Sequence, residues 1–189
     1  MAAMRLEIDE RLHLRPVAAD DAEAIHALVD ANRERLSPWL PWAAEQTLAG
    51  TREFVAESRA QEERGDGFQA ALVRDGELAG IAGYHRIDHV NRSTSIGYWL
   101  AAAHEGEGVM SAAVRALVAH AFTGLELHRV SIEAAVANRR SRAIPERLGF
   151  REEGLLRESQ LVGGRFLDAV LYSLLSSEWE RRPPERPAR

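Results

Sequence analysis

The chain has 189 residues, of which 46% are hydrophobic and 28% charged, a globular composition long enough to bury one sizeable core. A formal net charge of -5, with acidic and basic residues interspersed, argues against a nucleic-acid-binding face. No apolar run is long enough for a membrane span, and the N-terminal residues lack the apolar block of a secretory signal. We therefore expect a cytoplasmic protein that binds neither nucleic acid nor membrane.

Two residue types are absent from the sequence, cysteine and lysine. Without cysteine, the chain has no thiol nucleophile, no acyl-cysteine intermediate and no thiolate metal site. Without lysine, all 24 basic residues are arginine, which excludes a P-loop lysine and a Schiff-base amine. A covalent intermediate would have to form on Ser, Thr, Tyr, His or a carboxylate.

The first 36 residues predict a strand followed by a helix. Apolar residues alternate with polar ones over 12–17, which indicates a short strand. Asp20 with Glu23 three residues later resembles a capping box, so a helix is expected to begin there. Its apolar stripe continues to Leu36.

A proline-stiffened loop over 37–42 ends this helix and carries Trp39 and Trp42. These tryptophans either cover the core or line a substrate pocket, and we take them as candidate substrate-binding residues. A second helix is expected from near position 47 or 51 to about position 64, where a Gly-Asp-Gly turn closes it.

The period then changes to that of strands. Segments 68–73, 78–86 and 94–100 are separated only by short turns, so they predict three sequential antiparallel strands. A doubly wound parallel sheet would need a helical crossover between each pair, and this meander argues against one.

The C-terminal half alternates between the two periods. It predicts a buried helix from Glu107 to Gly124, a strand over 128–137, a short helix over 141–148, and closing strands over 150–157 and 166–175. The proline- and charge-rich residues 180–189 are expected to be a disordered tail. We see no second domain, so residues 1–179 are predicted to form a single one.

The most informative segment is the turn between the third meander strand and the long helix. Gly106 and Gly108 lack a Cβ and let the backbone approach a ligand, and the first-turn amides of the helix point toward it. A phosphate or pyrophosphate is the natural occupant. A dinucleotide fold would need a third glycine where Ser111 stands, together with a parallel sheet, and a plain loop remains the alternative reading of a lone Gly-x-Gly.

Three segments resemble the GNAT acyl-CoA N-acyltransferases. They are the strand 96–100, the turn 105–110 and the run 138–150, which reads Asn-Arg-Arg-Ser-Arg-Ala-Ile-Pro-Glu-Arg-Leu-Gly-Phe. More narrowly, they are similar to the RimJ/RimL-type branch, which includes ribosomal-protein N-terminal acetyltransferases. The resemblance extends from about Leu12 to Trp179. It implies the GNAT fold, of class α/β (α+β), with a mixed, mostly antiparallel central sheet of about seven strands flanked by about four helices.

The resemblance also implies where acetyl-CoA binds. The family turn Gln/Arg-x-x-Gly-x-Gly/Ala cradles the pyrophosphate, but here Glu105 replaces a neutral or basic residue and Met110 a small one. We therefore expect backbone amides to hold the anion while the acidic side chains of the turn point to water. The expected cofactor-binding residues are Tyr98, Trp99, Leu100, Glu105, Gly106, Glu107, Gly108, Val109, Met110, Ser111 and Asn138.

In the family, the strand equivalent to 96–100 parts from the strand equivalent to 131–136. The free backbone groups between them pair with the pantetheine arm, and the thioester lies where the strands separate. Tyr98 and Trp99 contribute through their backbone in this interpretation, and their side chains are equally compatible with being core aromatics. Asn138 is expected to hydrogen-bond the pantetheine arm.

Acyl transfer to an amine needs an acid for the departing thiolate. In many family members this acid is a tyrosine seven residues after the asparagine, a position that Pro145 occupies here. The local substitute is Ser141, three residues after Asn138, which is either the acid, a helix N-cap or both. As an N-cap it would place Pro145 in the first helical turn or just after it.

A base for the acceptor amine is also needed, and Glu133 is our candidate. Some N-terminal acetyltransferases of the family carry a glutamate there, and an acid within the otherwise apolar strand 130–136 needs an explanation. The alternative is an edge-facing surface carboxylate. His85 and Asp88 are second choices as base, and His85 is also a candidate for substrate binding. His85 and His89 would suit a metal only on a helix, so we predict none.

The sequence thus predicts an acetyl-CoA-dependent N-acetyltransferase that acts by direct transfer in a ternary complex. A protein N-terminus is the first acceptor and a small amine the second, and a homodimer is compatible with the family. A noncatalytic CoA-binding module and a nucleotide-binding regulator are the other interpretations. The sequence does not identify the acceptor, the length of the acyl group or the oligomeric state.

Overall fold

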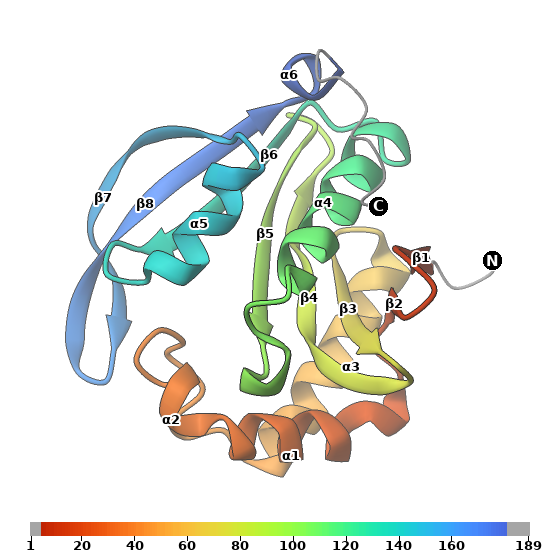
Figure 1. Ribbon diagram of the computed structural model, residues 1–189, viewed down its shortest axis with the longest axis vertical. Helices are drawn as coiled ribbons and strands as arrows, with labels where there is room; N and C mark the ends of the chain where they lie inside the picture. Colours follow the sequence, from red (N-terminus) through yellow and green to blue (C-terminus); the bar gives the residue numbers. More distant parts are fainter. Residues whose placement is uncertain (1–4, 181–189) are drawn as a thin grey trace.

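The computed structural model describes residues 5–180, whose strands form one open, eight-stranded sheet (Figure 1). The strands are β1 (Leu6–Glu7), β2 (Leu12–Pro16), β3 (Phe68–Arg74), β4 (Glu77–Asp88), β5 (Ser93–Leu100), β6 (Arg129–Ala135), β7 (Arg151–Val162) and β8 (Arg165–Leu175). The helices are α1 (Ala22–Ala31), α2 (Arg33–Leu36), α3 (Leu48–Arg64), α4 (Val109–Thr123), α5 (Arg139–Arg147) and α6 (Ser176–Glu180).

The sheet runs in the order β1-β2-β3-β4-β5-β6-β8-β7. Every neighbouring pair is antiparallel except β5 and β6, which are parallel and joined through α4. The predicted mixed, mostly antiparallel α/β class is confirmed. Over residues 5–180, the sheet has eight strands rather than about seven because the two-residue β1 adds to its edge. The same residues form six α-helices rather than about four because α2 and α6 are short separate turns.

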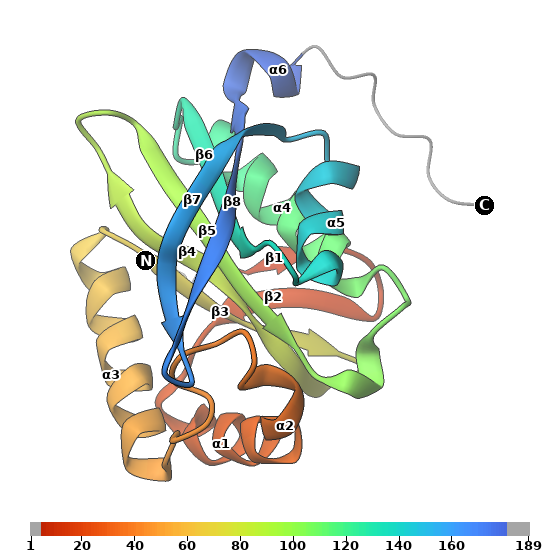
Figure 2. The ribbon, with the colours of Figure 1, turned by 90° about the vertical axis from the view of Figure 1, so that its left-hand side faces the viewer.

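Helices cover both faces of the sheet, and Figure 2 shows α3 on one side with α4 and α5 on the other. On the α4 face, a large core gathers one side of the strands around the buried helix residues Val114, Leu117 and Val118. On the other face, Ile25 and Val29 of α1 join Val55 of α3 over the sheet. Burial on both faces explains why β3 and β4 are nearly continuous apolar runs.

The first helix begins differently from the prediction. A 3-10 turn over Ala19–Asp21 precedes α1, and Asp21 rather than Asp20 closes it by accepting a hydrogen bond from the amide of Ala18 at 2.7 Å. Asp21 also forms a two-pronged ion pair with Arg15, at 2.6 and 2.7 Å. The capping-box prediction with Asp20 and Glu23 was wrong because the buried carboxylate of Asp21, one residue later than Asp20, binds both the amide of Ala18 and the guanidinium of Arg15.

The single domain over 1–179 stays a prediction, and the described residues 5–180 form one sheet with helices on both faces. Glu180, which the sequence assigns to a disordered tail, is the last residue of α6, and positions 181–189 of that tail lie outside the described residues. Within residues 5–180, none of the helices has the length and hydrophobicity to cross a bilayer.

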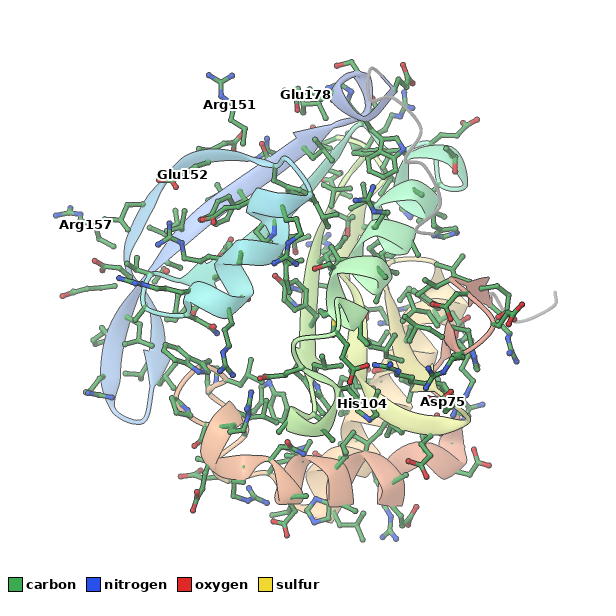
Figure 3. All side chains as sticks on the ribbon, viewed as in Figure 1. Asp75, His104, Arg151, Glu152, Arg157 and Glu178 are labelled. Atoms are coloured by element: carbon green, nitrogen blue, oxygen red, sulfur yellow. The ribbon has the colours of Figure 1, made fainter. Side chains whose placement is uncertain are left out.

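The outer edge of the sheet is β7, which is longer than predicted. It continues past position 157 through a register irregularity between Leu156 and Gln160. Arg151 and Arg157 point away from the molecule along this strand (Figure 3), whereas Glu152 pairs with Arg142 of α5 at 3.7 Å. Charged side chains on an edge strand disfavour pairing with the edge of another sheet.

Asn32 fixes the corner between α1 and α2. Its side-chain oxygen accepts from the amide of Ala102, after β5, and its side-chain nitrogen donates to the carbonyl of Leu28, each at 2.8 Å. Asn32 is buried, so these bonds hold α2 against the segment that follows β5. This contact joins two parts of the chain that are 70 residues apart.

We predict that Asn32→Ala lowers the free energy of unfolding by about 1–3 kcal/mol, because the amide and carbonyl lose a buried partner. Urea denaturation would measure it. Asn91→Ala is the matched control, since Asn91 is exposed and hydrogen-bonds within its own turn to Asp88, and it should cost about 0.5 kcal/mol or less. Equal losses in both variants would contradict a bridging role for Asn32.

Candidate active site

The parallel strands β5 and β6 pair over only three residues each. The paired residues are Ser93 with Arg129, Thr94 with Val130, and Ser95 with Ser131. The rest of β5 does not pair with β6. Beyond Ser95, the edge of β5 therefore offers backbone groups that are not used by β6. The predicted parting of these two strands is confirmed.

A cavity of about 1800 Å³ opens where the strands part. Of the candidate site residues named from the sequence, all but Glu107 and the second-choice base Asp88 line it. Those lining residues are Trp39, Trp42, His85, Tyr98, Trp99, Leu100, Glu105, Gly106, Gly108, Val109, Met110, Ser111, Glu133, Asn138 and Ser141. Most small-ligand pockets span about 300–1,000 Å³, so this one has room for two substrates.

The glycine turn leads directly into α4. Gly106 and Gly108 have φ angles of 82° and 77°, a left-handed conformation that strains other residues, and no atom would meet a Cβ at either position. Gly108 is the N-cap of α4 and supplies no side chain to its first turn. The amides of Val109, Met110 and Ser111 thus lack an intrahelical acceptor. They lie at the positive end of the helix dipole, and this end of α4 borders the cavity.

The two glutamates of this turn do not behave alike. Glu107 lies outside the cavity and pairs with Arg74, its side chain 51% exposed. Glu105 lines the cavity, is 27% exposed, and pairs with both Arg35 of α2 and Arg140 of α5. The expectation that both acidic side chains point to water was wrong for Glu105, because two arginines from other elements reach it.

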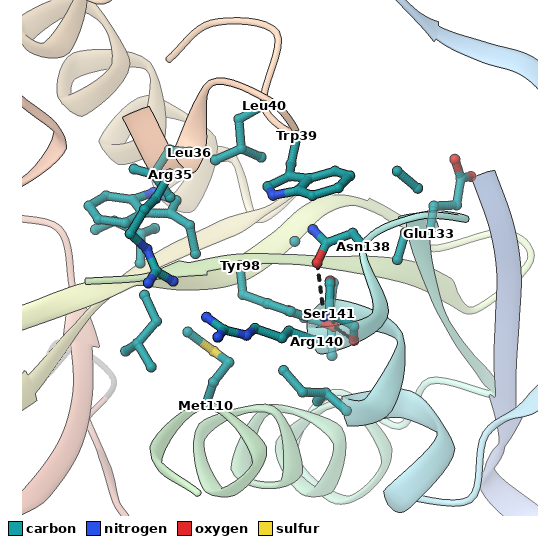
Figure 4. A pocket seen from close by; sticks show the side chains of 18 of the residues that line it. Arg35, Leu36, Trp39, Leu40, Tyr98, Met110, Glu133, Asn138, Arg140 and Ser141 are labelled. Carbon is teal, nitrogen blue, oxygen red and sulfur yellow. Dashed lines mark hydrogen bonds between the residues drawn. The ribbon is translucent and has the colours of Figure 1, made fainter. Parts of the chain in front are cut away.

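The N-terminus of α5 is capped by Asn138 and not by Ser141. The side-chain oxygen of Asn138 accepts from the amide of Ser141 at 3.1 Å (Figure 4). The capping role considered for Ser141 was therefore wrong, and its hydroxyl is free of the helix amides. Pro145 consequently lies in the last turn of α5 rather than near the first.

Pro145 leaves a gap that Tyr98 fills. In an α-helix the amide of residue 145 would donate to the carbonyl of Ser141, but proline has no N–H. The phenol of Tyr98, on β5, donates to that carbonyl at 2.9 Å, and the hydroxyl of Ser141 donates to the phenol oxygen at 3.3 Å. Burial raises the pKa of Tyr98 to about 12, so the phenol stays neutral. The side chain of Tyr98, and not only its backbone, thus belongs to the site.

His85, Ser95 and Glu133 line the same cavity. Nδ1 of His85 lies 3.3 Å from the hydroxyl of Ser95, and a Cβ at position 97 would overlap Nε2 of His85. Gly97 is therefore needed to make room for the imidazole. Burial lowers the pKa of His85 below its usual 6.5, although the charge of Glu133 opposes this, so the imidazole is neutral at pH 7.

Side-chain alternation puts these groups on opposite faces of the sheet. Tyr98 packs with the α4 core, whereas Trp99 packs with the α1 and α3 core. Because successive side chains on a strand point to opposite faces, Ser95 and Gly97 share the face of Trp99. Ile132 belongs to the α4 core, so Glu133 also lies on the Trp99 face. Tyr98 and Ser141 are thus separated by the parted strands from His85 and Glu133.

Trp42 and Trp99 pack edge to face on the second face, with ring centroids 6.3 Å apart, and Trp42 is 39% exposed. Trp39 projects into the cavity toward Asn138 (Figure 4). Both loop tryptophans therefore lie at the cavity.

Sequence reasoning missed several lining residues. Arg35, Arg140 and Arg147 were not singled out, although Arg147 donates to the hydroxyl of Ser111 at 2.6 Å and so ties α5 to the first turn of α4. The run of arginines after Asn138 was the available signal, because cations are unfavourable in the first turn of a helix.

The profile of the family described as "Acetyltransferase (GNAT) domain" matches residues 11–151. The chain is 44% identical over 176 residues to a putative ribosomal N-acetyltransferase, YdaF, of Bacillus subtilis, with 92% of this chain and 96% of that protein covered. It is 30% identical over 169 residues to the ribosomal-protein-serine acetyltransferase of Escherichia coli, with coverage of 89% and 94%.

Among solved structures, the chain is similar to RimL, a ribosomal L7/L12 alpha-N-protein acetyltransferase in complex with coenzyme A. The two have a TM-score of 0.89 and 26% sequence identity, covering 93% of this chain and 99% of that one.

We predict that the link between Tyr98 and Pro145 is measurable as an energetic coupling. Tyr98→Phe should lower the free energy of unfolding by about 1–2 kcal/mol, because the carbonyl of Ser141 loses its donor. In a Pro145→Ala background, the new amide can donate to that carbonyl, so the same change should cost less than half as much. Denaturant titration of the four proteins tests this, and additive losses would show that Tyr98 does not replace the missing helix bond.

Proposed function

The chain belongs to the GNAT acetyltransferase family and is an acetyl-CoA N-acetyltransferase of the ribosomal-protein type, and we propose that it transfers acetyl directly to a protein N-terminal α-amine. The observation that carries direct transfer is the single cavity between the parted strands. It joins the glycine turn to the residues around Trp42 and Glu133, so both substrates fit in it at once. The absence of cysteine favours the same conclusion, since no acyl-cysteine forms.

The residues of the turn fit the phosphate end of acetyl-CoA. The first-turn amides of α4 and the left-handed glycines form an open cradle with the chemistry of an anion site. The edge of β5 beyond Ser95 has the free backbone groups to pair with the pantetheine amides. Asn138 uses its oxygen to cap α5, which leaves its amide nitrogen to donate to the same arm.

On the α4 face of the sheet, Ser141 is the proposed proton donor to the departing thiolate. Its hydroxyl makes no bond to the helix amides and instead donates to the neutral phenol of Tyr98. Rotation of the hydroxyl from Tyr98 toward the sulfur would deliver a hydrogen bond or a proton. Tyr98 stays anchored to the Ser141 carbonyl throughout and positions the residue.

On the other face, Glu133 is the proposed base for the acceptor amine. It lies at the cavity on the strand next to the parted edge, and its charge acts on His85. The neutral imidazole of His85, held against Gly97, lines the path of the amine. Acid and base thus approach the reacting atoms from opposite faces, which lets one serve the thiolate and the other the amine.

The acceptor class rests on the relatives and on the shape of the site. Trp39 and Trp42 supply an apolar wall, and the 1800 Å³ cavity exceeds what a small amine needs beside the cofactor. A chain terminus inserted from solvent fits such a space. A small-molecule amine is the second candidate acceptor, and the homodimer that the sequence left open stays untested.

A panel of acceptors tests this proposal. CoA release from acetyl-CoA should be at least about tenfold faster, as kcat/KM, with peptides that carry a free α-amine than with the same peptides blocked at the N-terminus. Polyamines and free amino acids serve as the comparison. Faster turnover with a small amine than with every peptide would reject the protein N-terminus as acceptor, and release without an acceptor would argue against direct transfer.

We predict a pH signature for the base. Glu133→Gln should lower kcat/KM by about 100-fold near pH 7 and by less above pH 9, where more of the amine is already neutral. His85→Gln should have a smaller effect near pH 7, because His85 lines the cavity beside the proposed base and does not itself take the proton from the amine. If Glu133→Gln keeps the natural pH profile while His85→Gln loses its acidic limb, the base is His85.

A further inference from the structure

Two arginines from opposite sides of the cavity meet one carboxylate. Arg35 comes from α2 and Arg140 from α5, and both pair with Glu105, the latter at 2.6 Å. Figure 4 shows the side chain of Arg140 running between Tyr98 and Met110 toward Arg35. All three charged groups line the cavity, so the cluster crosses the cofactor side of the site.

The position of Arg140 is unfavourable for α5 on its own. Arg139 and Arg140 occupy the first turn, which contains no acidic residue, although the positive end of the helix dipole lies there. Glu105 is equally unusual for its turn, because a carboxylate stands beside the amides that form the anion cradle. When two residues with unfavourable local charge, here Arg140 and Glu105, meet at one site, their pairing indicates a functional constraint.

We propose that Arg35 and Arg140 bind the pyrophosphate of CoA, and that Glu105 is an internal competitor that occupies both guanidinium groups until the cofactor arrives. The inference rests on acetyl-CoA being the substrate. A guanidinium recognises a carboxylate and a phosphate with the same paired N–H donors, so one anion can replace the other.

The charges of this cluster favour the exchange. Glu105 neutralises one of its two arginines, which leaves one positive charge beside the amides of α4. If Glu105 stayed in place, the pyrophosphate would enter next to a carboxylate, and both Arg35 and Arg140 would already be paired. Glu107 does not interfere, since Arg74 holds it outside the cavity.

The exchange has a consequence for the reaction cycle. A carboxylate that stabilises the empty site lowers the apparent affinity for the cofactor and for its product alike. When CoA leaves, Glu105 re-forms its two ion pairs, so an anionic group again faces the two arginines after the phosphate groups depart. Glu105 therefore favours product release at the expense of affinity.

Titration calorimetry at fixed ionic strength tests the proposal with three probes: CoA, dephospho-CoA and S-acetyl-pantetheine. Glu105→Gln should lower the dissociation constants of CoA and dephospho-CoA by about twofold to tenfold and leave that of S-acetyl-pantetheine unchanged. Glu107→Gln is the matched control, because it removes the same charge from the same turn without freeing Arg35 or Arg140. Its effect should be less than half as large on a logarithmic scale.

Arg140→Gln should weaken the binding of both nucleotide probes, and in the Glu105→Gln/Arg140→Gln double variant the gain from Glu105→Gln should shrink. Unfolding temperatures of the free proteins show that each variant is folded. The proposal is overturned if Glu105→Gln weakens CoA binding or matches Glu107→Gln, or if Arg140→Gln affects CoA but not dephospho-CoA, which would assign Arg140 to the 3′-phosphate. Failure of the folded natural protein to bind CoA would instead reject the proposed function itself.

Discussion

The separation of β5 from β6 after three paired residues is the constraint on which the site depends. A continuous ladder would bury the edge of β5 and divide the two faces of the sheet. Because the ladder stops at Ser95, one cavity has access to both faces, and side-chain alternation then supplies it with different groups from each. Gly97 is part of the same arrangement, since only a residue without a side chain leaves room for the ring of His85 at the point of separation.

The short helix α5 completes the site by a route that differs from the common family pattern. Pro145 stands where many relatives carry a tyrosine, and its missing N–H leaves the carbonyl of Ser141 without a helical donor. Tyr98 brings a phenol to that carbonyl from the neighbouring strand. A phenol therefore lies beside the candidate acid even though the helix does not carry one, and the same hydrogen bond ties α5 to the parted edge of β5.

Local patterns in the sequence were sufficient to predict the main helices and strands and the glycine turn before α4. The apolar stripe of α4, the meander of β3 to β5 and the paired glycines each have a direct physical cause within a short stretch of chain. The capping of α5 was not predictable in the same way, because Asn138 and Ser141 are both good caps and the choice depends on where the chain leaves β6. The partners of Glu105 were further out of reach, since Arg35 is 70 residues away and its position depends on the buried bonds of Asn32.

The absence of lysine acquires a chemical meaning at this cavity. A thioester reacts with an unprotonated primary amine, so a lysine near the thioester would compete with the acceptor for the acetyl group. The cations that line the cavity are all arginine, Arg35, Arg139, Arg140 and Arg147, and a guanidinium stays protonated at neutral pH. Arginine also matches phosphate with paired donors where lysine offers a point charge. The site thus combines cations suited to anion binding with no lysine side chain, so no lysine competes with the acceptor that enters from solvent.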